Sequence, residues 1–464
     1  MKKIGIVICN YNKKEYVLKC IESLQRQTFR DFEIFAVDNA STDGSAKAVA
    51  KAYGKAVHLL QLPENIGGTG GFNQGLRQAM AGDFDGFLLL DNDVVLKEDC
   101  LEQLVSLMNS REEIGILGCK ILRMDEPDTI QEFGPVLDPE NVNFILRYRG
   151  EKDSLPQPDV LPCDYVPACA MLVRREVVER IGLMPEENFI YYDDIEWCYR
   201  CRQAGWQVAA ANKAKAWHKG GAGIQTTTFS VYYINRNKTE FYMRYFPEKF
   251  QTEEEKQEAI NHRVDVILRD MFEGNFVCKQ QGQLNVLKTR MDAFLDALEG
   301  KKGKAEDWKI RPHEHTYLDR FKEVMGKAKK IALYTHGDEP NTSRILAFLR
   351  IVEQERGEVM DITLVDRETQ GENLFGLAVL SELPGKESDY DYVLHVCRHV
   401  YKLEIEEFDA CYVDGWGNLM LGAEDFEKLV DYRKMLEMFV LGYRERMVQQ
   451  MTDMSVALQE KAPA

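Results

Sequence analysis

The stretch GFLLLDNDVVLKED, residues 86–99, decides how the N-terminal half of this chain folds. An apolar run typical of a buried strand leads directly into Asp91, Asn92 and Asp93, and a second apolar run follows. Two carboxylates this close repel each other and resist the loss of hydration. One explanation is a turn, because Asp and Asn are common turn residues. The other explanation is that a positively charged partner binds there.

Around this stretch, strand patterns alternate with helical patterns. The expected strand regions are 3–12, 32–45, 57–68 and 87–96, and the helical patterns are 16–27, 45–54, 72–81 and 98–110. This alternation predicts an α/β fold with a doubly wound, mostly parallel sheet covered by helices on both faces. Polar or Gly-rich sequence (CNYN, DNASTDGS, ENIGGTGG, DND) stands at the carboxyl end of each strand. Ligands bind such sheets at that edge, so we expect these motifs to converge.

The rest of the chain changes character twice. A strand and a helix are expected at 163–182, an acidic helix at 189–206, and a last strand at 207–221 that runs into His218. From about residue 228 the segments are long, charged and helical, and from about residue 329 strand–helix alternation resumes. We therefore expect a catalytic domain over 1–245, a helical extension over 246–328 and a smaller C-terminal α/β domain over 329–464.

Composition and charge exclude some classes of protein. The chain has 464 residues, 45% of them hydrophobic and 29% charged, as in ordinary globular proteins. A net charge of −17 argues against broad nucleic-acid binding, which needs a basic surface. The sequence shows neither a secretory signal nor an apolar run of about 18 residues, and its 11 cysteines follow no disulfide pattern. We expect a reduced, cytoplasmic enzyme, with the Cys198/Cys201 pair inside a helix and not on zinc.

The aspartates of the opening stretch favour a metal site. Asp91 and Asp93 stand two apart, so in a strand both point to the same face. Hard oxygen ligands on one face suit Mg²⁺ or Mn²⁺ bridging a diphosphate. His218 ends a strand in the same converging set, which makes it a candidate third ligand, although a lone His is more often structural.

Two further motifs indicate a nucleotide pocket. Asp38 at a strand end can accept a hydrogen bond from an imide such as that of uracil, although an N-cap or Asx turn is an equal explanation. The run GGTGGFNQG, residues 67–75, is not a dinucleotide fingerprint, because Asn73 stands where the third glycine belongs. Glycines at a helix N-terminus nevertheless let the backbone approach an anion closely.

The stretch YYDDIEW, residues 191–197, begins a helix with three acids among aromatic residues. The helix dipole favours acids there by about 0.3–1 kcal/mol, which explains one of them. Three acids are better explained by a carboxylate base beside a stacking wall. We predict a base among these acids, with Asp193, Glu196 and Trp197 facing the acceptor.

Together these motifs resemble family 2 glycosyltransferases, which have the GT-A fold. The resemblance rests on CNYN, VDNASTDGS, ENIGGTGGFNQG, LLLDNDV, YYDDIEWCYRCRQAGW and AWHKGG in this order, over about residues 1–245. The forms DDIEW and WHKGG look closest to the bacterial galactofuranosyl- and rhamnosyltransferase-like branch. The family usually has Glu-Asp where this chain has Asp193-Asp194, which leaves the role of Asp193 open.

The resemblance implies a role for each motif. Asp38 would hold the base of a UDP- or dTDP-sugar, and Asn65 with the Gly67–Gly71 turn would line the donor pocket. The donor-binding set is Asn10, Asp38, Asn65, Gly67, Gly68, Gly71, Asn73, Asp91 and Asn92. Asp93 would be the direct metal ligand, with Asp91 nearer the ribose or sugar and His218 completing the site. Asp194 matches the catalytic base.

The expected reaction is inverting, metal-dependent glycosyl transfer. Asp194 would take the proton of an acceptor hydroxyl, whose oxygen attacks the anomeric carbon opposite the diphosphate. A cell-surface glycan or its lipid-linked precursor is the acceptor that the resemblance suggests. Two alternatives stay open: a sugar nucleotidyltransferase, which usually carries a Gly-rich basic loop after the first strand, and a non-catalytic nucleotide-sugar-binding or scaffold protein.

Two regions are less informative. The basic, aromatic stretch 231–250 fits either a peripheral contact with a membrane surface or a helix packed on the catalytic domain. The C-terminal domain could bind a partner, form a homo-oligomer or position a growing glycan. Its His395, Cys397 and His399 suggest a metal less than they suggest ordinary structural residues.

Overall fold

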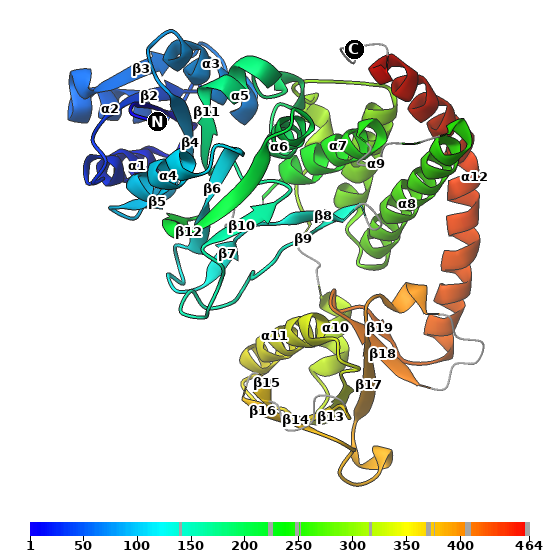
Figure 1. Ribbon diagram of the computed structural model, residues 1–464. Coiled ribbons are helices and arrows are strands. Elements are labelled where there is room, and N and C mark those ends of the chain that lie inside the picture. The colour runs from blue at the N-terminus through cyan, green and yellow to red at the C-terminus, as the bar shows by residue number, and fades with distance from the viewer. Residues whose placement is uncertain are drawn as a thin grey trace. The chain divides into compact units, whose positions relative to one another are not determined.

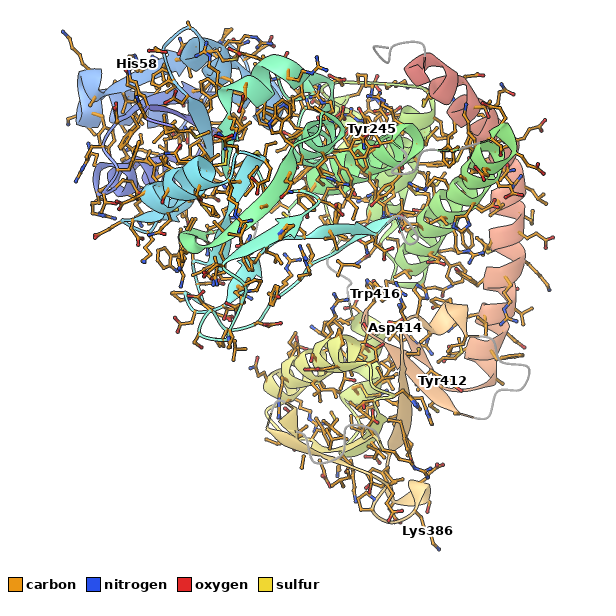
Figure 2. The ribbon with its side chains drawn as sticks, in the orientation of Figure 1. His58, Tyr245, Lys386, Tyr412, Asp414 and Trp416 are labelled. Carbon is orange, nitrogen blue, oxygen red and sulfur yellow. The ribbon has the colours of Figure 1, made fainter. Side chains whose placement is uncertain are left out.

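A computed structural model shows the chain in Figure 1, and Figure 2 adds its side chains. It describes residues 1–138, 142–220, 226–245, 250, 252–314, 318–367, 373–374, 376–403 and 410–459. The chain forms two compact units. The first contains Met1–Asp270, Thr289–Pro312 and Met447–Ala464, and the second contains Met271–Lys288 and His313–Arg446. The expected helical extension is thus divided between the two units, and each unit is described by itself below.

A ten-stranded sheet forms the centre of the first unit. Its main path runs β10–β12–β6–β11–β4–β1–β2–β3, while β5 pairs with β12 and β7 with β6. The strands are β1 (Ile4–Asn10), β2 (Phe32–Asp38), β3 (Val57–Gln61), β4 (Gly86–Asp91), β5 (Val94–Leu96), β6 (Ile114–Arg123), β7 (Ile130–Glu132), β10 (Val160–Cys163), β11 (Ala170–Arg174) and β12 (Gln207–His218). A small hairpin, β8 (Val136–Asp138) with β9 (Asn143–Ile145), stands apart.

The first four strands are parallel, as the alternating sequence predicts. Beyond them the sheet is mixed, because β11 runs antiparallel to both β4 and β6. Strand β12 then pairs parallel with β6 and antiparallel with β5. This last pairing matters for function, because it sets His218 opposite Val94, one residue after Asp93.

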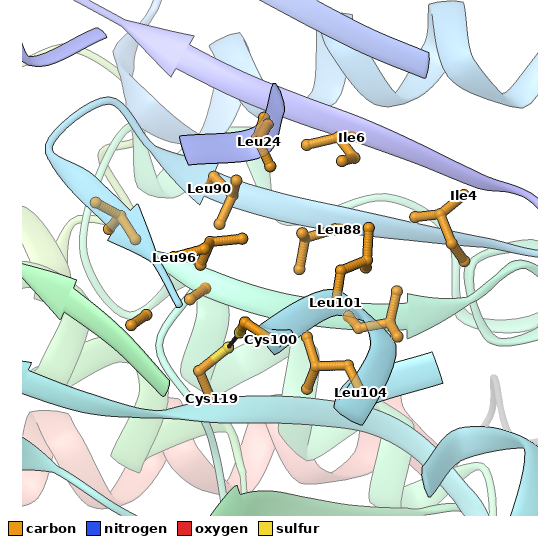
Figure 3. Packing of buried hydrophobic residues seen from close by; sticks show 14 of the residues in the cluster. Ile4, Ile6, Leu24, Leu88, Leu90, Leu96, Cys100, Leu101, Leu104 and Cys119 are labelled. Carbon is orange, nitrogen blue, oxygen red and sulfur yellow. Dashed lines mark hydrogen bonds between the residues drawn. The ribbon is translucent and has the colours of Figure 1, made fainter. Parts of the chain in front are cut away.

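Helices cover both faces of this sheet. They are α1 (Lys14–Gln25), α2 (Ser45–Tyr53), α3 (Gly67–Met80), α4 (Cys100–Ser110), α5 (Arg175–Ile181), α6 (Asp193–Gln203) and α7 (Phe229–Arg244), with η1 (Gly54–Ala56) and η2 (Glu186–Asn188). Alternate strand residues such as Ile4, Ile6, Leu88 and Leu90 pack against α1 and α4 in the core seen in Figure 3. The intervening residue Val7 meets α3 at Gly75 on the other face.

The cysteines are structural. All eleven are free, and Cys198 and Cys201 are buried in α6, as expected for helix residues. Cys100 and Cys119 meet at 3.4 Å between their sulfur atoms, inside the core of Figure 3.

The second unit has its own parallel sheet. Its order is β15–β16–β14–β13–β17–β18–β19, with antiparallel pairs at both edges. The strands are β13 (Lys330–Tyr334), β14 (Asp361–Val365), β15 (Asn373–Leu374), β16 (Leu377–Leu380), β17 (Tyr392–Cys397), β18 (Cys411–Asp414) and β19 (Leu419–Met420). Helices α10 (Asp319–Met325) and α11 (Glu339–Arg356) pack on one face, and η4 (Glu387–Asp389) and η5 (Val400–Lys402) are short.

Two long helices, α8 (Glu253–Gln280) and α9 (Leu284–Leu298), stand in the chain between the strands of the two sheets, with η3 (Asp307–Lys309) after them. A third long helix, α12 (Ala423–Gln459), follows the last strand of the second sheet. None of the helices in the described ranges is long and apolar enough to cross a bilayer.

Candidate active site

The polar ends of three neighbouring strands form one hydrogen-bonded chain. The Asn10 side chain, at the end of β1, donates to the Asp38 carboxylate of β2 at 3.1 Å. It also accepts a hydrogen bond from the Asn92 amide, after β4, at 2.9 Å. All three side chains are buried. The expected convergence at the carboxyl edge therefore takes the form of direct contacts.

Asp91, Asp93 and His218 come together beside this chain. Each offers a ligand atom, and the three atoms lie within 4.8 Å of one another. His218 Nε2 lies 3.3 Å from Asp93 Oδ1 and 3.8 Å from Asp91 Oδ2. They are the one group in the described part of the chain that could hold a metal ion. Two carboxylates and an imidazole are a donor set that fits Mn²⁺ or Mg²⁺.

Cations already offset the charge of the aspartate pair. Lys13, in the loop after β1, places Nζ 2.6 Å from Asp93 Oδ2. Burial alone would raise the pKa of Asp93, but His218 and Lys13 outweigh it and hold the pKa at about 2. Asp91 is less well paired: burial raises its pKa to about 6, although 40% of its side chain stays exposed. Asp93 is thus the buried, ionised member of the pair. Asp91 is the more accessible member, and its ionised form is less well stabilised.

The ring of His218 is oriented by a second residue. Its Nδ1 lies 3.1 Å from the side-chain amide of Gln131 in β7, so Nε2 faces the aspartates. Burial lowers the pKa of this imidazole, but the contacts with Asp93 and Asp91 more than compensate and raise it. A histidine that binds a metal usually donates its far N–H to an acceptor, and the side-chain amide of Gln131 stands at the position of that partner.

The acids that begin α6 approach the same edge. Asp193 is buried and accepts a 2.7 Å hydrogen bond from Thr69 Oγ1 of α3, and its charge acts on Asp91. Asp194 is half-buried, with one carboxylate oxygen 3.2 Å from the Ala168 amide. Burial first, and then the like charge of Asp193, raise the pKa of Asp194. A partly accessible carboxylate with a raised pKa has the character of a general base.

The loop before α6 is strained. Phe189, Tyr191 and Tyr192 have φ angles of 65°, 64° and 64°, which bulky residues rarely adopt. The buried Asn237 of α7 holds it by donating to the Asn188, Ile190 and Tyr191 carbonyls at 2.9–3.0 Å. Strain of this kind persists where surrounding contacts enforce it, and it often marks functional sites.

Helix α7 is therefore a packing element of this unit. In the described part of the stretch 231–250, Tyr232, Tyr233, Arg236 and Tyr242 are buried. Arg236 also donates to backbone carbonyls of the 187–188 segment. Residues 246–249 lie outside the described residues. These contacts favour the packing interpretation of the stretch over contact with a membrane.

The Gly-rich turn serves packing and positioning at once. Gly67 has φ 85°, and a Cβ there would meet the Phe189 carbonyl at 2.1 Å. A Cβ on Gly71 would lie 2.3 Å from the Cys9 sulfur, whereas one on Gly68 would meet nothing closer than 3.6 Å. Of these three glycines, Gly68 is the one at which a larger side chain would meet no steric obstacle. Asn65 accepts from the Gly67 amide at 2.9 Å and shapes the turn.

Asn73 does not face a ligand, contrary to its predicted donor-binding role. It is fully buried, and its amide pairs with both the carbonyl and the N–H of Met184, at 2.8 and 3.1 Å. Asp38 is also buried, and its two oxygens accept from Asn10 and from the Ser41 amide. Asp38 therefore shapes the loop after β2.

Two of the residues predicted to bind an acceptor are placed elsewhere. Trp197 is fully buried, and its indole donates to the Gly182 carbonyl at 2.9 Å, so it offers no face for stacking. Glu196 is buried against Tyr245, labelled in Figure 2, whose hydroxyl donates to it at 2.6 Å. Asp193 remains near the site. Successive residues of α6 face different sides of the helix. A substrate can therefore reach only those whose side chains are not buried.

Sequence reasoning missed three residues that complete the site. Lys13 pairs with Asp93, Gln131 orients His218, and Thr69 binds Asp193. Lys13 could have been suspected, because it follows the first strand directly, at the edge where ligands bind. Gln131 and Thr69 carry no signal of their own, since each acts through a residue distant in sequence.

Comparisons with known proteins identify relatives of this part of the chain. Residues 5–182 match the family described as Glycosyl transferase family 2. The chain is 26% identical over 242 residues to the low-salt glycan biosynthesis hexosyltransferase Agl10 of Haloferax volcanii, covering 51% of this chain and 74% of that protein. It is 26% identical over 237 residues to the N-acetylglucosaminyl-diphospho-decaprenol L-rhamnosyltransferase of Mycobacterium tuberculosis, covering 46% and 75%.

A third relative is the galactofuranosyltransferase GlfT2 of Mycolicibacterium smegmatis. The identity is 21% over 239 residues, which cover 46% of this chain and 36% of that protein. Over residues 5–182 the chain thus matches the family 2 glycosyltransferases, as the motifs of this part of the sequence predict.

Proposed function

We propose that this family 2 glycosyltransferase domain moves a sugar, with inversion, from a UDP- or dTDP-sugar to a hydroxyl of a glycan. One observation carries the proposal: Asp91, Asp93 and His218, a group that could hold a metal ion, share an edge with Asp193 and Asp194 at the start of α6. Such a pairing supplies what the reaction needs, a place for a sugar diphosphate and a base for the acceptor hydroxyl.

The donor would lie along the carboxyl edge of β1, β2 and β4. Asp93 and His218 would hold Mn²⁺ or Mg²⁺, with Asp91 nearer the ribose or sugar. The bound cation would act as a Lewis acid on the diphosphate. Lys13 is within reach of the same phosphates, because its Nζ already lies at Asp93. Asn10, Asn92, Asn65, Gly67 and Gly68 would shape the pocket, with Asp38 at its base end.

Asp194 would act as the general base. Its carboxylate accepts the proton of the acceptor hydroxyl while that oxygen attacks the anomeric carbon from the face opposite the diphosphate. The bond to the diphosphate breaks, the configuration inverts, and no covalent enzyme intermediate forms. A raised pKa suits this step, because a base of pKa nearer neutrality takes a proton more effectively than an ordinary carboxylate. Asp193 would keep the base correctly placed at the start of α6.

The relatives suggest the substrates. Their names describe transfer of hexose, rhamnose and galactofuranose, and one of them acts on a lipid-linked diphosphate. We propose a cell-surface glycan or its lipid-linked precursor as the acceptor. Rhamnose and galactofuranose are the first sugars to test.

The donor site can be tested by thermal unfolding with UDP, dTDP, GDP and their sugars, with and without Mn²⁺. A ligand at a hundred times its dissociation constant adds about 2.7 kcal/mol to the free energy of unfolding. We expect a metal-dependent increase with one nucleotide that is lost in Asp93→Ala. The matched control is Asp31→Ala, which also removes a carboxylate. Asp31 is exposed and precedes β2, at the end of that strand away from the proposed donor site.

The outcomes separate the competing functions. The same increase in wild type and Asp93→Ala would remove Asp93 from the donor site. An increase without transfer of sugar or hydrolysis of the donor would instead favour a nucleotide-sugar-binding protein. No increase with any nucleotide would contradict the donor site.

A further inference from the structure

The second unit has a cavity at the carboxyl edge of its own sheet. Strand β13 lies at the centre of that sheet, with β14 on one side and β17 on the other. The direction of winding therefore reverses at β13, and such switch points are where open α/β sheets bind ligands. A cavity of about 460 Å³ opens there, lined by the ends of β13, β14, β16 and β17.

The floor of the cavity is built from rings. Tyr334 and His395 lie on adjacent strands with ring centroids 4.8 Å apart and planes within 6°. His336 adds a third ring, 5.1 Å from His395, with 2.9 Å between Nε2 of one and Nδ1 of the other. Tyr334 and His395 are half-buried and His336 is exposed, so the rings are accessible from the cavity.

Polar groups surround these rings. Asp366, at the end of β14, is buried and fixed by Thr335 Oγ1 and the Gly337 amide, both at 2.6 Å. The rim consists of exposed residues: Arg367, Ser381 and Glu382. A stack of aromatic rings beside carboxylate, hydroxyl and guanidinium groups combines ring surface with hydrogen-bonding groups of both kinds.

The surrounding charges disfavour a phosphate. Helix α11 follows β13, and its N-terminus is capped by the Asp338 carboxylate, with Glu339 in the first turn. The Asp338 carboxylate already accepts from an N–H group of this helix start, and Glu339 adds a like charge, so an anion is disfavoured there. In the cavity lining, Asp366 and Glu382 outnumber the single guanidinium of Arg367. The ligand that fits is therefore neutral and rich in hydroxyls.

We infer that this cavity binds a sugar residue of a glycan. The exposed edges of the stacked rings would contact the apolar C–H groups of the sugar, and the rim would exchange hydrogen bonds with its hydroxyls. The identification of this glycan as the acceptor rests on the proposed function. The binding of a sugar in the cavity does not depend on it. The site would hold a glycan chain independently of the donor site.

Saturation-transfer NMR on the full chain tests this inference. The probes are the methyl glycosides of rhamnose, galactofuranose, glucose and N-acetylglucosamine, with UMP for comparison. We expect at least one glycoside to bind wild type, and Tyr334→Ala to weaken it roughly tenfold, or about 1.4 kcal/mol. Glu382→Ala, on the exposed rim, should weaken the same glycoside without any risk to folding.

Two controls locate the signal. His58→Ala removes an exposed ring of the first unit, labelled in Figure 2, and should leave binding unchanged. Asp93→Ala should also leave it unchanged, so a failed donor site and a failed sugar site give different results. Binding that is equal in wild type and Tyr334→Ala would overturn the inference. Failure of every glycoside to bind, or binding of UMP that depends on Tyr334, would also overturn it.

Discussion

Each unit of this chain has a parallel sheet, yet the carboxyl edges of the two sheets carry different chemistry. In the first unit the strand ends bring Asp91, Asp93 and His218 together, with Lys13 against Asp93. In the second unit the corresponding ends present the Tyr334 and His395 rings around a cavity. The same architecture thus gathers charged side chains at the edge of one sheet and stacked aromatic rings at the edge of the other.

The comparison shows how little of the function lies in the sheet itself. Both edges contain a buried aspartate that accepts a hydrogen bond from a threonine, Asp193 from Thr69 and Asp366 from Thr335. What differs is the residue at each strand end and its neighbours. Carboxylates at strand ends suit a cation, and through it a diphosphate, whereas rings with a few polar groups suit a neutral ligand.

The largest expected effect is on transfer itself. Asp194→Asn keeps the shape of the side chain but cannot accept a proton, so we expect transfer to fall by about 10²–10⁴-fold. Donor binding should persist, because Asp194 contacts Ala168 and not the metal-binding group. Initial rates and donor-dependent thermal stability measure the two effects separately. Turnover equal to wild type would remove Asp194 from the role of base.

The two threonines provide a matched test of the comparison. Thr69→Val and Thr335→Val each remove a hydrogen bond to a buried aspartate, which we expect to cost about 1–3 kcal/mol of unfolding free energy. Thr69→Val should also reduce transfer, because Asp193 stands beside the base. Thr335→Val should leave transfer to a small acceptor unchanged. Equal loss of activity in both would contradict the separation of the two edges, with urea unfolding and initial rates as the measurements.

A pair of glycines tests which positions packing requires. Gly71→Ala places a Cβ 2.3 Å from the Cys9 sulfur, and we expect overpacking to cost about 1–3 kcal/mol. Gly68→Ala meets nothing closer than 3.6 Å and should fold normally. If the turn approaches the donor, Gly68→Ala will weaken nucleotide binding at unchanged stability. Nucleotide titrations of the Gly68→Ala protein decide this, and unaltered affinity would count against that approach.

The smallest expected effect is a change in pH dependence. Burial and the charge of Asp193 raise the pKa of Asp194, and the base works only when ionised. The rate should therefore fall as pH drops through this raised pKa, above the usual range of carboxylates. Asp193→Asn removes the like charge, so the acidic limb of the pH–rate profile should move to lower pH. A displacement of one pH unit corresponds to about 1.4 kcal/mol of electrostatic interaction. The pH profile of kcat/KM measures it, and a limb that moves upward would contradict the assignment.

Much of the fold and part of the site could be predicted from residues near one another in the chain. The alternation around 86–99 indicates parallel strands, and their polar ends indicate where Asp91, Asp93 and His218 would meet. Local patterns cannot show which polar side chain turns toward protein and which toward solvent. Asn73 illustrates this, since its amide binds Met184 and leaves nothing for a donor.

The sequence by itself determined the four parallel strands of the first sheet and the acids at its edge, because strand periodicity and polar strand ends are local properties. Only the tertiary structure decided the rest. It buried Trp197, brought Lys13 to Asp93 and Gln131 to His218, and held the strained loop before α6 with Asn237. These outcomes depend on contacts between segments far apart in the chain, where packing and desolvation select among side chains that look alike in sequence.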